Sequence, residues 1–137
     1  MSIARSALVC TGLLFLAKCA MAAPLPGKVL SVYDGDTFTV EIEHWPNQIY
    51  RGPVRVRGID APEIKGACQS EKDAAIRARD TVRALTKDGI TVDEIALDKY
   101  GRLLAKVMVG TEDLAAKMIA AGLARPYDGG TRGGWCP

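Results

Sequence analysis

Hydrophobic residues along this chain switch between two spacings, one typical of strands and one typical of helices. Alternation of apolar and polar residues predicts a strand, because successive side chains point to opposite faces of a sheet. Apolar residues three or four positions apart predict a helix with one buried face. These spacings predict strands over residues 27–32, 37–42, 54–59, 90–97 and 103–109, and helices from Ser70 to a stop at Gly89 and over 113–121.

The predicted strands differ in how clearly they alternate. The second strand places three apolar side chains on one face, namely Phe38, Val40 and Ile42. In the third, Val54 and Val56 lie opposite Arg55 and Arg57, so the two arginines are expected to share a face. Residues 44–52 contain a Trp-Pro-Asn sequence and are predicted to form a loop.

Both helices carry signals at their ends. Ser70 is expected to begin the first helix, with Asp73 three residues later as a partial capping box. The apolar face of that helix is predicted to contain Ala74, Ala78, Val82 and Leu85. Thr111 is expected to cap the second helix, whose Leu114 and Met118 face inward. The order of three strands, a helix, two strands and a helix predicts an α+β protein, mainly β, built on a five-stranded barrel of the OB type with two helices.

The first 22 residues have the layout of a secretory signal peptide. Arg5 supplies a basic start, residues 7–17 are almost wholly apolar, and Ala20-Met21-Ala22 is a small-x-small cleavage sequence. The apolar run is too short for a stable membrane anchor. We expect cleavage after Ala22, which leaves residues 23–137 as a single domain that is periplasmic or secreted.

Cleavage also changes the charge of the chain. The full sequence has 18 basic and 16 acidic residues. Removal of Arg5 and Lys18 leaves 16 of each sign, so the mature chain is neutral. Because nucleic-acid-binding proteins usually have a basic excess, any attraction to phosphate is expected to be local.

Two cysteines remain after cleavage, Cys68 and Cys136. An even pair in an exported chain predicts a disulfide, which would stabilise the fold by roughly 3–5 kcal/mol. Two free thiols are the alternative. Neither cysteine belongs to a CxxC sequence, which argues against a zinc or redox site.

Carboxylates occur in two clusters that a barrel can bring together. Asp36 begins the second predicted strand, and Asp60 follows the third. Two aspartates with a backbone carbonyl and water suit calcium, which prefers six to eight oxygen ligands. The alternative for Asp34-Gly35-Asp36 is an ordinary turn, since Asp-Gly is a common hairpin sequence.

Other charged residues near these clusters suit hydrolysis of a phosphate ester. Glu63 can orient or deprotonate a water molecule, and arginines can hold the charge that develops on phosphorus. Spacing alone does not choose between Arg55 and Arg57 for this purpose, and Arg102 supplies a second candidate. The alternative for each is a solvated surface charge. His44 is the only histidine, so mechanisms that need two histidines are excluded.

Four motifs and their order give a resemblance. Asp34-Gly35-Asp36-Thr37, residues 55–63, residues 98–102 and Gly122-Leu123-Ala124 resemble the corresponding motifs of the thermonuclease family, the staphylococcal-nuclease-like domains. The similarity covers about residues 27–127. It implies an OB-type barrel and calcium-dependent hydrolysis of DNA and RNA.

The resemblance also implies roles for individual residues. Asp36 and Asp60 would bind calcium together with the carbonyl of Ala61, and Glu63 would be the general base or orient the water. Arg55, rather than Arg57, would be the first phosphate-binding arginine.

The remaining implied roles concern the substrate. Arg102 would be the second phosphate-binding arginine, with Lys99 and Tyr100 near the neighbouring phosphate. The 5′ oxygen would leave, so the product would have a 3′-phosphate end. We expect a monomer without stable membrane association, and an inactive OB-type nucleic-acid-binding module is the alternative.

The chain departs from the family pattern at several points. Ala61 replaces a threonine, the stretch between Asp36 and Arg55 is long, and a glycine-rich tail ending in Trp135-Cys136-Pro137 replaces a third helix. The predicted Cys68–Cys136 disulfide is expected to substitute for that helix.

Overall fold

A computed structural model describes residues 23–137 of the chain. The predicted signal peptide, residues 1–22, lies outside the described residues. The elements in chain order are β1 (Leu25–Val32), β2 (Thr37–Trp45), β3 (Gln48–Val56), β4 (Ile59–Asp60), α1 (Gln69–Thr86), β5 (Ile90–Leu97), β6 (Leu103–Val109), β7 (Glu112–Asp113), α2 (Leu114–Ala120) and β8 (Arg125–Pro126).

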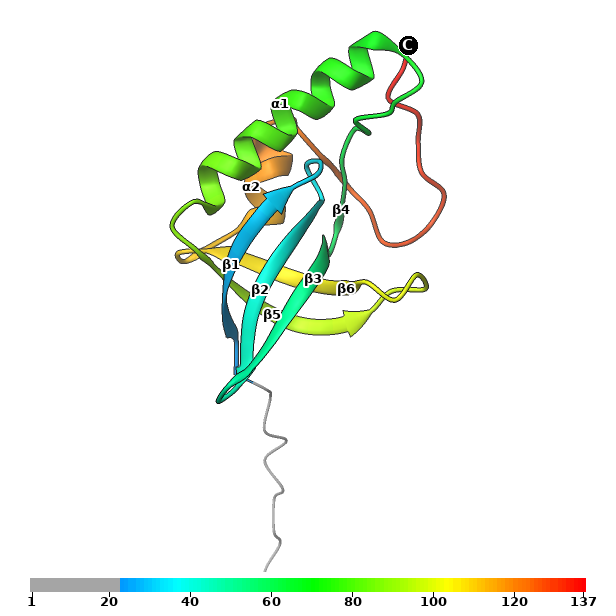
Figure 1. Ribbon diagram of the computed structural model, residues 1–137. Helices are drawn as coiled ribbons and strands as arrows, with labels where there is room; N and C mark the ends of the chain where they lie inside the picture. Colours follow the sequence, from blue (N-terminus) through cyan, green and yellow to red (C-terminus); the bar gives the residue numbers. More distant parts are fainter. Residues whose placement is uncertain (1–22) are drawn as a thin grey trace, which may run out of the picture.

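Five strands form a closed barrel, as the sequence predicted (Figure 1). β1, β2 and β3 are consecutive antiparallel neighbours, and β5 lies between β1 and β6. Parallel pairing of β3 with β6 closes the barrel, with Val54 opposite Leu103 and Arg55 opposite Leu104. The start of β6 therefore lies beside the end of β3, which brings the backbone of Arg102 close to that of Arg55.

The core confirms the alternation predicted for β2, because Phe38, Val40 and Ile42 are all buried. α1 lies across one end of the barrel (Figure 1) and buries Glu71, Ala75, Ala78, Val82 and Thr86. This face differs from the predicted one, since Ala74 and Leu85 are only half-buried. The difference arises because two polar residues, Glu71 and Thr86, lie on the buried face, where they form hydrogen bonds that hydrophobicity does not reveal.

The predicted loop over residues 44–52 is wrong. β2 continues to Trp45 and β3 begins at Gln48, so only Pro46 and Asn47 form the turn, with Asn47 at a φ of 64°. Backbone pairing continues past the core in this hairpin, where the side chains of Trp45 and Ile49 are exposed. The hydrophobic alternation is therefore lost before the strands end.

The third predicted strand, residues 54–59, is divided in the structure. β3 ends at Val56, and Gly58 follows with a φ of 85°. Ile59–Asp60 then forms β4, which pairs with β8 instead of the barrel. Asp60 is therefore held by pairing with a segment that lies more than 60 positions later, at Arg125.

The helix ends were predicted less accurately than the helices. Cys68 is the N-cap residue of α1 and makes no side-chain capping bond, while Asp73 accepts a bond from the Gln69 side chain. Asp113, rather than Thr111, caps α2 by accepting from Ala115 N–H at 2.9 Å. Gly89 and Gly122 follow the two helices with positive φ values, as expected for helix stops. Within the described part of the chain, no helix combines the length and the apolar character needed to span a bilayer.

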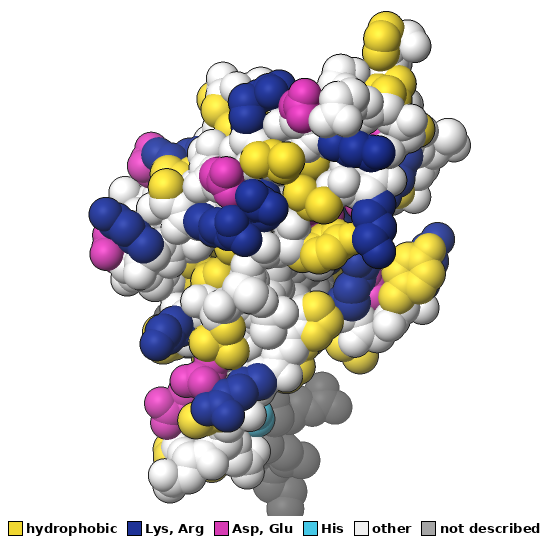
Figure 2. Space-filling view, turned by 45° about the horizontal axis from the view of Figure 1, so that its top comes forward, with side chains coloured by type: hydrophobic (Ala, Val, Ile, Leu, Met, Phe, Trp, Pro, Cys, Tyr) yellow, Lys and Arg dark blue, Asp and Glu magenta, His cyan; other side chains and the backbone are white. Residues whose placement is uncertain are grey.

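Basic side chains are more prominent than acidic ones on one face of the molecule (Figure 2). On the face drawn in Figure 2, lysine and arginine side chains form several separate groups, and acidic side chains lie beside some of them. This face is therefore more basic than residues 23–137 as a whole, which hold equal numbers of basic and acidic residues.

Candidate active site

The turn between β1 and β2 is both a hairpin turn and part of the candidate site. The Asp34 carboxylate accepts hydrogen bonds from the backbone N–H groups of Asp36 at 3.1 Å and Thr37 at 2.9 Å. A Cβ on Gly35 would lie only 2.8 Å from Cβ of Ala78 in α1, so glycine is required here by close packing. The Asp-Gly turn and the acidic site are therefore compatible interpretations of one segment.

The Asp34 carboxyl titrates far from its ordinary range. Burial, and then the charge of Asp36, raises the pKa of Asp34 from 3.8 to about 7. The folded protein thus binds more protons than the unfolded chain between pH 4 and pH 7, and its free energy of unfolding decreases as the pH rises through this range.

We therefore expect Asp34→Asn to stabilise the protein above pH 7. Asparagine keeps an acceptor oxygen for the two backbone N–H groups and removes the buried charge, which is unfavourable by up to about 4 kcal/mol. Urea unfolding at pH 4 and pH 8 in chelator measures this effect. The exposed Asp88→Asn makes the same charge change and is the control; equal pH dependence in wild type and Asp34→Asn would contradict the prediction.

Asp36 is buried and points toward the segment that follows β4. Its Oδ2 accepts a hydrogen bond from the backbone N–H of Ala61 at 2.8 Å, and its Oδ1 accepts from the Thr37 hydroxyl at 2.8 Å. These two contacts fix the orientation of the carboxylate. They also tie the first acidic cluster to the second, as the barrel topology predicted.

Three carboxylates converge on one guanidinium group, that of Arg132. Its Nη2 lies 2.8 Å from Oδ1 of Asp60 and 3.8 Å from Oδ2 of Asp36. Its Nη1 donates to Oε1 of Glu63 at 2.8 Å. Burial acts to lower the pKa of Arg132, but the charge of Asp60 and the hydrogen bond to Glu63 outweigh it and raise that pKa above its usual range. Asp36, Asp60 and Glu63 thus face a common space.

Arg55 belongs to the same cluster, whereas Arg57 does not. The buried guanidinium of Arg55 lies 3.5 Å from the Asp36 carboxylate and donates to the carbonyl of Val56 at 3.0 Å. Arg57 instead donates to the carbonyl of Glu94 at 2.7 Å. The prediction that both arginines share a strand face is wrong, because β3 ends at Val56 and Arg57 already lies in the following turn.

The turn between β5 and β6 carries the other predicted substrate residues. The Asp98 carboxylate accepts from the Arg102 side chain at 2.7 Å and from the backbone N–H of Tyr100 at 2.8 Å. Lys99 and Arg102 both lie near the ring of Tyr100, which is largely exposed. Among the contacts of residues 23–137, none joins Arg102 to the three converging carboxylates.

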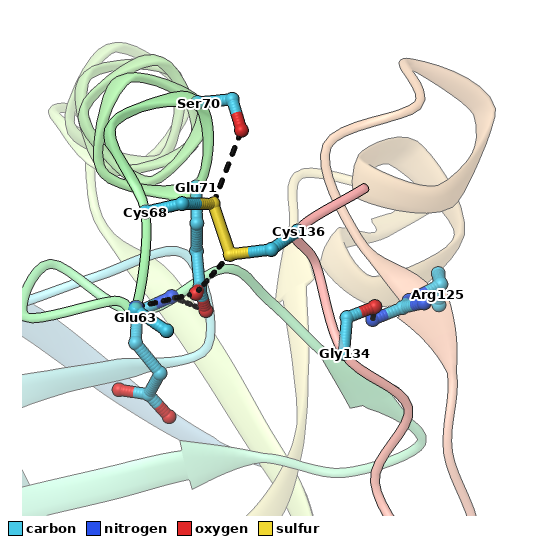
Figure 3. Close-up of a disulfide and its surroundings, with 8 residues drawn as sticks. Glu63, Cys68, Ser70, Glu71, Arg125, Gly134 and Cys136 are labelled. Carbon is cyan, nitrogen blue, oxygen red and sulfur yellow. Dashed lines mark hydrogen bonds between the residues drawn. A yellow bond between two sulfur atoms is a disulfide. The ribbon is translucent and has the colours of Figure 1, made fainter.

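The loop before α1 is organised by the buried carboxylate of Glu71. It accepts hydrogen bonds from the backbone N–H groups of Glu63 at 3.3 Å and Ala67 at 2.9 Å. Figure 3 shows the Glu63 carboxylate directed away from this loop. Cys68 and Cys136 form the predicted disulfide beside Glu71, so the end of the chain is attached next to the site.

Besides Glu71 and Asp98, the residues that the sequence did not predict come from the C-terminal tail, residues 127–137, and the strand before it. Besides Arg132, the indole N–H of Trp135 donates to Oδ2 of Asp60 at 3.1 Å. The Arg125 guanidinium lies 3.7 Å from the centre of the Trp135 ring. A cleft of about 260 Å³ lies between the tail and the loop before α1. The predicted disulfide was the signal that could have identified these residues, because it brings the tail to the segment after Glu63.

Comparison with known proteins gives the family. A family model described as staphylococcal nuclease homologue matches residues 53–132, more than half of the chain. The chain belongs to this family. The matched region includes Arg55, Asp60, Glu63 and Arg102, while Asp36 lies before it.

Two relatives of this staphylococcal nuclease homologue were found among curated proteins. Protein ParB of Escherichia coli is 33% identical over 117 residues, which cover 77% of this chain and 59% of that protein. Thermonuclease of Staphylococcus hyicus is 34% identical over 101 residues, which cover 72% of this chain and 57% of that protein. The chain therefore spans less than three-fifths of the length of either relative.

The residues of the site are suited to a divalent cation. Oδ1 of Asp60 is one of two buried side-chain atoms in residues 23–137 without a hydrogen-bond partner. The Arg132 nitrogen near it makes an ion pair without hydrogen-bond geometry. Because Oδ1 of Asp60 faces a second buried carboxylate and is paired only with the Arg132 guanidinium among residues 23–137, it fits a hard cation such as calcium or magnesium.

Proposed function

We propose that this protein is an exported, calcium-dependent nuclease that hydrolyses phosphodiester bonds of DNA and RNA. The observation that carries the proposal is the convergence of Asp36, Asp60 and Glu63 beside the buried guanidinium of Arg55. Membership of the staphylococcal nuclease homologue family supports it, and one relative is named thermonuclease. Residues 23–137 would be the mature domain, and the Cys68–Cys136 disulfide supports export to an oxidising compartment.

In this proposal Asp36 and Asp60 hold the calcium ion, with the backbone carbonyl of Ala61 as a further ligand. When bound, the ion supplies positive charge that favours the negatively charged phosphate and its transition state. The hydrogen bond from Ala61 N–H keeps one carboxylate aligned with the segment that carries the other.

The reaction itself would be carried by side chains of the chain. Glu63 orients the attacking water and accepts its proton, since its carboxylate is partly exposed and can reach a solvent molecule. Arg55 and Arg102 hold the phosphate oxygens and stabilise the charge that develops on phosphorus. The 5′ oxygen then leaves, and the product keeps a 3′-phosphate.

The turn between β5 and β6 would contact the substrate outside the scissile phosphate. Lys99 offers a charge and Tyr100 an exposed ring, which is suited to stacking on a base or binding the neighbouring phosphate. Arg102 would exchange its ion pair with Asp98 for the phosphate when substrate binds.

The test of this function uses purified residues 23–137 with plasmid DNA and with RNA, in calcium or in excess chelator. We expect calcium-dependent degradation with 3′-phosphate ends, detected by the requirement for phosphatase before the ends can be extended. Plasmid that is retarded in a gel but stays intact would instead identify a nucleic-acid-binding module.

A pair of variants tests the assignment of the metal site. We expect Asp36→Asn to weaken the calcium dependence of hydrolysis much more than Arg57→Ala does, because Arg57 binds a backbone carbonyl away from the carboxylates. Calcium titrations of the hydrolysis rate give the comparison. Equal losses in the two variants would show that the site has been assigned to the wrong residues.

A further inference from the structure

Arg132 lies where the acidic side chains of the site would otherwise repel one another. Its two terminal nitrogens lie within 4 Å of carboxylate oxygens from Asp36, Asp60 and Glu63. Two of these carboxylates, Asp36 and Asp60, are buried, and charges held so close together are costly without a cation among them. The guanidinium therefore offsets part of the negative charge of the cluster in the metal-free protein, together with Arg55 beside Asp36.

The contacts of Arg132 overlap with those that a divalent cation would use. Its Nη2 approaches Oδ1 of Asp60, the oxygen without a hydrogen-bond partner, and Oδ2 of Asp36. A guanidinium and a divalent cation repel each other, so both cannot occupy the space between the same two oxygens. One has to leave when the other binds.

The tail holds Arg132 near the site and leaves its side chain able to move. Arg125 donates hydrogen bonds to the carbonyls of Gly133 at 3.0 Å and Gly134 at 3.1 Å. The indole N–H of Trp135 donates a hydrogen bond to the carboxylate of Asp60. The disulfide at Cys136 closes the same segment. The Arg132 side chain is nevertheless 43% exposed, so it can turn toward solvent without disturbing the core.

We propose that Arg132 is an internal counter-ion of the acidic site, which withdraws when a divalent cation binds and so sets the metal affinity of the protein. The proposal rests on the cation site described under the proposed function. It adds a residue of the tail to that site and gives the disulfide a role in binding, because the bond keeps the competing charge close to the carboxylates.

Isothermal titration with calcium measures this competition directly, without any hydrolysis assay. We expect Arg132→Gln to bind calcium about tenfold more tightly than the wild type, since the metal no longer displaces charge-assisted contacts. Arg51→Gln is the matched control, because Arg51 also pairs with a carboxylate but is an exposed residue of β3. Its calcium affinity should equal that of the wild type.

Thermal unfolding gives a second readout. In chelator, Arg132→Gln should melt at a lower temperature than the wild type, because the three carboxylates lose their counter-ion. Saturating calcium should raise its melting temperature more than that of the wild type. Reduction of the disulfide should tighten calcium binding in the wild type and leave Arg132→Gln unchanged.

Unchanged or weaker calcium binding by Arg132→Gln would overturn the proposal, as would the absence of calcium binding in both proteins. The proposed nuclease function fails by a different result, the lack of hydrolysis. A shift in calcium affinity without hydrolysis would support the counter-ion proposal and contradict the nuclease function. Hydrolysis without such a shift would support the nuclease function and contradict the counter-ion proposal.

Discussion

Replacement of Glu63 by glutamine is expected to lower the rate of phosphodiester hydrolysis by about 10²- to 10⁴-fold, the usual contribution of a general base. Glutamine has nearly the same shape and can still accept the hydrogen bond that Arg132 now donates to Glu63. It cannot take a proton from water. Because the carboxylate is partly exposed and lies outside the core, the fold should change little.

The measurement is the initial rate on plasmid DNA at saturating calcium. Glu43→Gln, an exposed position at the end of β2, makes the same chemical change away from the site and should keep the wild-type rate. A Glu63→Gln variant with more than a tenth of the wild-type rate would rule out Glu63 as the base and restrict it to a minor orienting role.

Replacement of Arg55 by lysine is expected to lower the hydrolysis rate by about 10²- to 10³-fold, which is typical for loss of one group that stabilises charge in the transition state. Lysine keeps the positive charge beside Asp36, so the buried carboxylate still has a counter-ion. It lacks the planar fork with which arginine holds two phosphate oxygens. The loss should therefore appear in kcat more than in stability.

Arg57→Lys is the matched control for this experiment, because the two arginines differ by only two positions and have different surroundings. Arg57 donates to the carbonyls of Glu94 and Leu104, away from the acidic cluster. Its replacement should change kcat by no more than a few fold. A similar loss of kcat in both variants would mean that the effect comes from the strand end rather than from a phosphate contact.

The sequence was sufficient to predict the barrel and most of the acidic cluster. Alternation in β2 depends on burial, which hydrophobicity reports directly, whereas the buried face of α1 also contains the polar residues Glu71 and Thr86 and was predicted only in part. Asp36 lies at a strand end of the barrel and Asp60 follows a neighbouring strand, so barrel topology predicts their approach, but the pairing of β4 with β8 that holds Asp60 was not predicted. The division of the third strand at Gly58 was missed, because a short strand such as β4 has no periodicity of its own.

The tail was the part that the sequence could not place. A glycine-rich segment has no regular spacing, and Arg132 and Trp135 are held by polar contacts with residues about 70 positions earlier. The hydrophobic pattern carries no information on such contacts. The disulfide places the end of this segment, but the direction of each side chain depends on hydrogen bonds with Asp60 and Glu63.

The pairing of β4 with β8 has a consequence during synthesis. A nascent chain still attached to the ribosome at residue 120 has made Asp36, Asp60 and Glu63 but lacks the strand that holds Asp60 in position. Asp60 can take its final position only after Arg125 and Pro126 have left the ribosome and paired with β4. Asp60 is therefore fixed later in synthesis than Asp36, whose neighbouring strands β1, β2 and β3 pair with segments adjacent to them in the chain.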